Sequence, residues 1–163
     1  MNKELQDFYD NTVKAHIECM LKDKFSEKNI TPPICYTLGE DGSVGMGFIQ
    51  LGEGVSPMTA IKPIVAQFQP KAYLFCGEAW VKGIDKKDYA SKEEINKVEK
   101  RMQDFGVRNE KDKFEILTAI LGTRSGEQHQ RMYYIHRNKK NRIIKVTIRK
   151  KLTSGKIVSR HTP

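Results

Sequence analysis

The chain has 163 residues, which is enough for one domain with a substantial hydrophobic core. Charged residues make up 30% of the chain and hydrophobic residues 38%, so the composition is globular and no stretch approaches the length of a membrane-spanning helix. The net charge of +9 is unevenly distributed: residues 128–163 contain 11 Lys and Arg and no acidic residue, whereas residues 1–127 hold 18 basic and 20 acidic residues. A block of one sign attracts partners of the opposite charge.

The predicted elements begin with an amphipathic helix over residues 3–25. Its apolar side chains recur at three- and four-residue intervals from Leu5 to Phe25, which places them in one stripe. Pro32 and Pro33 end this helical unit, because proline cannot continue a helix.

A β-hairpin is predicted next. Its two strands cover residues 34–39 and 44–51. Asp41 and Gly42 suit a two-residue turn in which both central positions have positive φ. This turn predicts that Leu38 faces Gly45 across the ladder.

Two further helices are predicted on either side of an apolar strand. Ser56 and Pro57 are typical of a helix start, and this helix extends to residue 68. Residues 72–82 are mostly apolar, as expected for a central strand. Residues 91–94 form a capping box that opens the third helix, and Gly106 is suited to end it.

The last third of the chain predicts a four-stranded β-meander. Its strands cover residues 113–121, 129–136, 142–152 and 156–161. With Lys139 and Lys140 as a two-residue loop, Ile135 faces Ile144, and the third strand presents one apolar face and one basic face. A turn at residues 154–155 then places Arg160 on the same basic face.

These elements predict a single α+β domain over residues 1–163. Its sheet is mainly antiparallel, with an N-terminal hairpin and a C-terminal four-stranded meander, and about three helices pack against it. The three cysteines fit a reducing compartment and give no disulfide framework. Because the first residues are charged and lack the apolar core of a secretion signal, we expect a cytoplasmic protein with no membrane partner.

The basic face of the meander predicts a binding site for a polyanion. Cations release condensed counterions from phosphates, and exposed rings on a sheet stack on unpaired bases. The predicted site consists of Lys139, Lys140, Arg142, Lys145, Arg149, Lys151, Arg160, Tyr134 and His136. No sequence pattern distinguishes DNA from RNA here. The alternative is a solvated face that protects an edge strand.

A second candidate site lies on the central strand. Cys76, Glu78 and Trp80 alternate along it and therefore point to one face. A carboxylate beside a thiol would support catalysis in a pocket. The favoured interpretation is structural, with Cys76 and Trp80 in the core and Glu78 paired to a Lys or Arg of the meander.

No metal or cofactor is predicted. His16 and Cys19 share a helical face, and Cys35 and Cys76 would complete a zinc site only if the fold brought all four together. Paired C-x-x-C spacing is absent, and the glycines of residues 45–54 match neither a phosphate loop nor a dinucleotide motif.

Three functions follow from these observations. The leading one is a non-enzymatic binding protein whose basic C-terminal sheet binds DNA, RNA or another polyanion. The second is a protein-interaction or assembly module, in which the basic end docks an acidic protein, or the stripe of Met102 and Phe105 or an edge of the meander forms a homo-oligomer. The third is an enzyme with a pocket near Cys76, Glu78 and Trp80.

Overall fold

Three helices and seven strands make up the part of the chain that the computed structural model describes, which consists of residues 1–22, 32–52, 55–84, 89–105, 110–111, 113–148 and 156–161. The helices are α1 (Lys3–Leu21), α2 (Pro57–Phe68) and α3 (Lys92–Phe105). The strands are β1 (Ile34–Leu38), β2 (Val44–Phe48), β3 (Ala72–Ile84), β4 (Lys113–Thr123), β5 (Gln128–Arg137), β6 (Ile143–Ile148) and β7 (Lys156–His161). The predicted α+β class is confirmed. The predicted extension of α1 to residue 25 lies outside the described residues.

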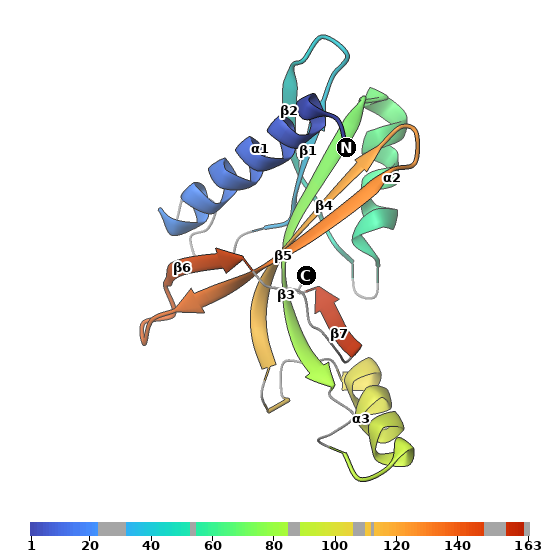
Figure 1. Cartoon of the computed structure of the whole chain (residues 1–163), viewed down its shortest axis with the longest axis vertical. Coiled ribbons are helices and arrows are strands. Elements are labelled where there is room, and N and C mark those ends of the chain that lie inside the picture. The colour runs from blue at the N-terminus through green and yellow to red at the C-terminus, as the bar shows by residue number, and fades with distance from the viewer. Residues whose placement is uncertain are drawn as a thin grey trace.

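The strands form one twisted antiparallel sheet in the order β2-β1-β3-β4-β5-β6 (Figure 1). β7 pairs with residues 79–84 of β3, beyond the point where β1 ends. The predicted four-stranded meander is therefore wrong in its last member, because only β4, β5 and β6 follow one another in space. β3 is longer than β1, and β7 pairs with the backbone edge of β3 that β1 leaves open.

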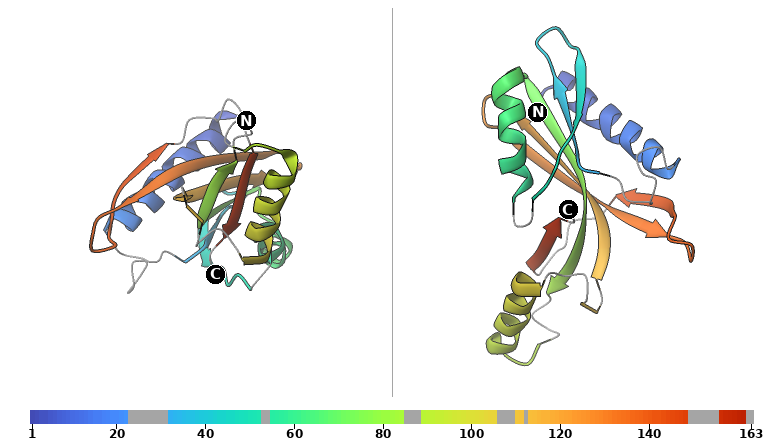
Figure 2. Two further views of the ribbon diagram at one scale, coloured as in Figure 1. Left: turned by 90° about the horizontal axis from the view of Figure 1, so that it is seen from below. Right: turned by 180° about the vertical axis from the view of Figure 1, so that it is seen from behind.

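Helices cover both faces of the sheet, with α1 on one side and α2 on the other (Figures 1 and 2). Beneath α1, Tyr9 and Val13 join a core that includes Leu74 and Leu117, and this side is called the α1 face. The opposite side is called the α2 face. Its core under α2 consists of Cys35, Ile49, Ile61, Phe75 and Ile120.

Helix α3 packs near the far end of β3 (Figure 1). Val98 and Met102 cluster with Trp80 of that strand, and Met102 is only 1% exposed. The prediction that Met102 belongs to a free stripe for self-association is wrong, because its own domain buries it. The side chain of Phe105 lies outside the described residues.

Each helix begins at a polar cap, as the sequence predicts for two of them. The Asn2 and Ser56 side chains accept from backbone N–H groups three residues ahead. The predicted capping box at α3 is present in a shifted form: Ser91 Oγ accepts from Glu94 N at 3.3 Å, and the Glu94 carboxylate accepts at 2.8 Å from Ala90 N, one residue before the cap.

The three consecutive-strand hairpins share one loop design. Each loop has three residues, and the third lies in the left-handed region: Gly42 at φ 81°, Gly126 at φ 89° and Asn141 at φ 61°. Such a loop is a tight turn followed by a left-handed residue, which glycine and asparagine adopt most easily. The two-residue turns predicted at Asp41-Gly42 and Lys139-Lys140 are therefore wrong, and in the first hairpin Leu38 faces Val44.

Candidate functional site

The β5–β6 hairpin brings three of the predicted site residues onto one face. Tyr134 pairs with Thr147 and His136 pairs with Lys145, which places all four side chains on the α2 face. The predicted pairing is displaced, because Ile135 faces Val146 instead of Ile144. A β-bulge at His136 and Arg137 adds one residue to the shift that the three-residue loop introduces. The two shifts add to an even number, so the predicted basic face keeps its residues.

Three more predicted residues lie in the turn at the tip of this hairpin. Lys139, Lys140 and Arg142 are exposed there, and together they are called the cationic turn. The Asn138 carboxamide oxygen accepts from the backbone N–H of Lys140 at 2.9 Å and of Arg142 at 3.0 Å. These bonds fix the backbone of the turn, while the long cationic side chains remain in solvent.

A row of rings crosses the strands beside these cations. Phe114 meets Tyr134 edge-on at 5.1 Å between ring centroids, and Tyr134 lies 6.5 Å from His136. Thr147 Oγ1 lies 3.0 Å from His136 Nε2 and fixes the imidazole. Phe114 was not predicted as a site residue, because it joins the row only through the pairing of β4 with β5. Phe114 and Tyr134 are partly buried and pack against Ala79, Val81 and Ile116, whereas His136 is exposed beside Lys145.

The remaining predicted residues do not join this face within the described structure. Arg160 lies on β7, where its backbone pairs with Trp80 of β3, so its expected position beside β6 is wrong. Arg149 and Lys151 lie outside the described residues.

Two arginines of the basic block make ion pairs with the rest of the domain within the part of the chain that the structure describes. Arg137 makes a two-pronged ion pair with Glu115, with both N–O distances at 2.7 Å, and its guanidinium also lies 3.3 Å from Glu78. Arg131 pairs with Asp10 at 2.6 Å and covers the ring of Tyr9 at 4.6 Å. These contacts join β5 to its neighbouring strands and to α1, and Arg137 is largely withdrawn from solvent, whereas Arg131 stays 34% exposed.

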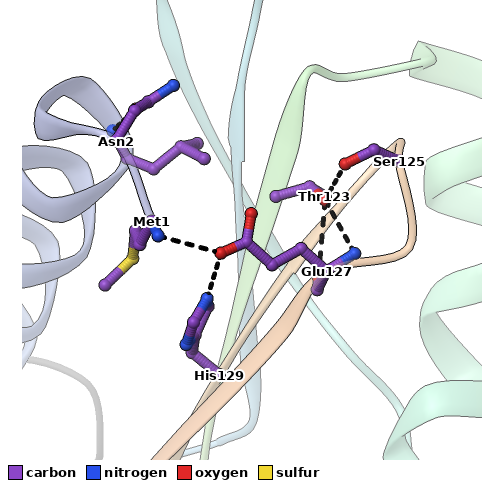
Figure 3. Close-up of polar contacts among 7 residues, drawn as sticks. Met1, Asn2, Thr123, Ser125, Glu127 and His129 are labelled. Carbon is purple, nitrogen blue, oxygen red and sulfur yellow. Dashed lines mark hydrogen bonds and ion pairs between the residues drawn. The ribbon is translucent and has the colours of Figure 1, made fainter.

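Lysines of the hairpin differ from these two arginines. Lys139, Lys140 and Lys145 are exposed and form no ion pair with any part of the chain that the structure describes. The acidic residues nearest to these lysines in the sequence interact with other groups. Glu127, for example, accepts from His129 and from the Met1 ammonium group, whose nitrogen lies 3.2 Å from Glu127 Oε1 (Figure 3). The bond from His129 is the main reason that the pKa of Glu127 is lowered.

The second candidate site has the geometry of a structural core. Cys76 is fully buried under α1, and burial raises its pKa well above the usual range of a thiol. Glu78 is 7% exposed and is held by Arg137, a partner of the predicted kind. Trp80 packs against α3 and lies under Lys113, whose Nζ is 5.1 Å from the ring centroid. Burial thus suppresses the thiolate that nucleophilic catalysis would require.

The four residues considered for a zinc site do not converge. Cys35 belongs to the core under α2, whereas Cys76 belongs to the core under α1 on the other face of the sheet. His16 belongs to α1 and is buried on the side of the helix that faces the sheet, where its Nδ1 lies 2.8 Å from the Tyr36 hydroxyl. Within the described ranges, His, Cys, Asp and Glu form no group of three or more that could hold a metal ion.

No protein family model, curated protein or solved structure matches this chain. Among the residues that the structure describes, no helix is both long enough and apolar enough to cross a membrane.

Proposed function

We propose that this protein binds a polyanion, and single-stranded nucleic acid in particular, through the β5–β6 hairpin. The observation that carries the proposal is the shared face of Tyr134, His136 and Lys145, which the cationic turn extends at the hairpin tip. Phosphates would lie along the lysines, and unpaired bases would stack on the rings. A cytoplasmic location and a non-enzymatic role remain predictions from the sequence.

The chemistry of the face favours unpaired bases over a protein surface. An acidic protein would need only the cations, whereas the face also presents the exposed imidazole of His136 and the partly buried ring of Tyr134 near Lys145. Every base has a flat face that can stack on such rings without regard to its identity. We therefore expect weak sequence preference and a steep dependence on salt.

Binding is tested by fluorescence anisotropy with labelled random single strands of DNA and RNA and with a random duplex. The logarithm of affinity should fall with the logarithm of salt concentration by about 0.7 per neutralised phosphate on a single strand. The triple variant K139Q/K140Q/K145Q should lower that slope by about 2 and weaken binding to every sequence. Absence of binding at low salt would refute the proposal.

A charge-matched control separates local from general electrostatics. The triple variant K14Q/K62Q/K100Q removes the same charge from exposed positions on the three helices. It should retain most of the affinity, and equal weakening by both triple variants would count against a site on the hairpin.

The rings are tested separately. His136→Ala removes an exposed ring whose stacking on a base contributes about 1–3 kcal/mol. The variant should weaken single-strand binding while leaving binding of heparin, a polyanion without bases, unchanged. If heparin and nucleic acid lose affinity equally, the site recognises charge alone and the preference for nucleic acid is wrong.

A further inference from the structure

The outer strand β2 exposes a row of apolar side chains at one edge of the sheet. Val44, Met46 and Phe48 are 57%, 56% and 60% exposed, and together they are called the β2 row. Their β1 partners in the ladder belong to the core beneath α1. The side chains of the β2 row therefore point to the α1 face of the sheet, but they lie outside the core on that face.

The backbone groups of β2 that point away from β1 belong to the same three residues. Gly39 N donates to Ser43 O and Ile49 N donates to Pro33 O, each at 2.8 Å. In an antiparallel strand, alternate residues direct both their N–H and C=O groups to the same neighbour. Odd-numbered residues from 43 to 49 therefore face β1, and the β2 row directs its N–H and C=O groups away from the sheet.

This edge carries no charge. Residues 42–52 contain no Asp, Glu, Lys, Arg, His or Pro, although 30% of the chain is charged. Edge strands of folded proteins are usually protected by charged side chains, prolines or bulges, because an open apolar edge pairs with other strands. Two copies of this edge can approach each other without bringing like charges together.

We propose that β2 pairs with β2 of a second copy of this chain, in antiparallel orientation about a two-fold axis at Met46. In this register Met46 faces the partner's Met46, and Val44 faces the partner's Phe48. Each of these pairs exchanges two hydrogen bonds, so about six bonds satisfy every outward group of both rows. The two sheets become one continuous sheet, and both β2 rows lie side by side between the two α1 helices.

A second copy fits this edge better than an unrelated strand does. The pairing is self-complementary: a two-fold axis places the same uncharged segment on both sides, and each large side chain gains an apolar neighbour. The β2 row is also separate from the β5–β6 hairpin, because these elements lie at opposite ends of the strand order. Whether the chain dimerises is therefore independent of whether it binds a polyanion.

The oligomeric state of the full chain tests the proposal. Sedimentation equilibrium over a range of concentrations should show wild type in a monomer–dimer equilibrium. Met46→Lys should be monomeric, because it places two ammonium groups together at the axis. Phe68→Lys is the matched control, since Phe68 is a 65% exposed apolar residue on α2, and it should dimerise like wild type. A wild type that is monomeric throughout, or a dimeric M46K, would overturn the proposal.

Disulfide trapping tests the register in proteins that retain the wild-type edge. The M46C variant should form a covalent dimer under mild oxidation, because paired Cα atoms lie about 5.5 Å apart, within the range of a disulfide. In F48C the two introduced thiols are offset by four residues, about 13 Å along the ladder, and should not join. Wild type oxidised in parallel accounts for the native cysteines. Equal trapping of the two variants would contradict the two-fold axis at Met46.

Discussion

Arg137 is one of the residues that join the basic end of the chain to the acidic body. Its guanidinium is 14% exposed and lies between two buried carboxylates on neighbouring strands. The sequence predicts a cationic partner for Glu78, because a carboxylate within an apolar strand must be paired. It does not predict Glu115 as the third member, because that contact depends on the order β3-β4-β5. Residue chemistry thus predicts the kind of partner, and strand order decides which residue it is.

His16 should make stability depend on pH. Burial lowers its pKa from 6.5 to about 4. Between these values the unfolded chain binds a proton that the native protein does not, so stability is full above pH 6.5 and falls as the pH decreases towards 4. Wild type should lose about 2 kcal/mol of unfolding free energy from His16 alone between about pH 7 and pH 5. Urea unfolding of wild type and H16Q at both pH values measures this difference.

The variant H16Q controls for other titrating groups, because glutamine is neutral throughout and can still bond to Tyr36. Its stability should change less than that of wild type over the same range. An identical loss in both proteins would show that His16 is not the titrating group.

Hairpin loops are the elements that the sequence predicts least well. The sequence predicts the middle turn as the three residues 124–126, but in the first and last hairpins residue types locate the turn without revealing its third, left-handed residue. In the first hairpin the extra loop residue changes the partner of Leu38 from Gly45 to Val44, so the β2 side chains point to the face opposite to the predicted one. In the β5–β6 hairpin the bulge adds a second residue, so Tyr134, His136 and Lys145 keep their predicted face. The shared face of these three residues was thus predicted correctly through two errors that cancel.

The three-residue loop of the β5–β6 hairpin should be visible in the energetics of two adjacent isoleucines. Ile143 is 6% exposed and belongs to the core under α1, whereas Ile144 is 58% exposed. Ile143→Ala should cost about 2–4 kcal/mol, because it removes buried methyl groups and leaves a cavity. Ile144→Ala should change stability by less than about 0.5 kcal/mol. Urea unfolding decides between them, and the reverse ranking would restore the register predicted from a two-residue loop, in which Ile144 faces Ile135.

At the scale of the whole molecule, the two cores share their strands. Ile34 and Cys76 pair across β1 and β3 and point under α1, while Cys35 and Phe75 pair one position away and point under α2. The sequence predicts such strands from their continuous apolar runs. It does not predict that β7 returns to β3, because its apolar pattern fits either edge. Cores that share two strands are expected to unfold together, as one domain.

Thiol labelling of the native protein tests that cooperativity. Cys35 and Cys76 are buried in different cores, and burial raises the pKa of Cys35 to about 11. Both should react only when the domain opens, with equal opening free energies and an equal, steep dependence on urea. Half-buried Cys19 should react first and serves as an internal reference, with peptide mass spectrometry identifying each site. Faster labelling of Cys35 with little urea dependence would mean that the α2 face opens alone, and the single-domain prediction would then be wrong.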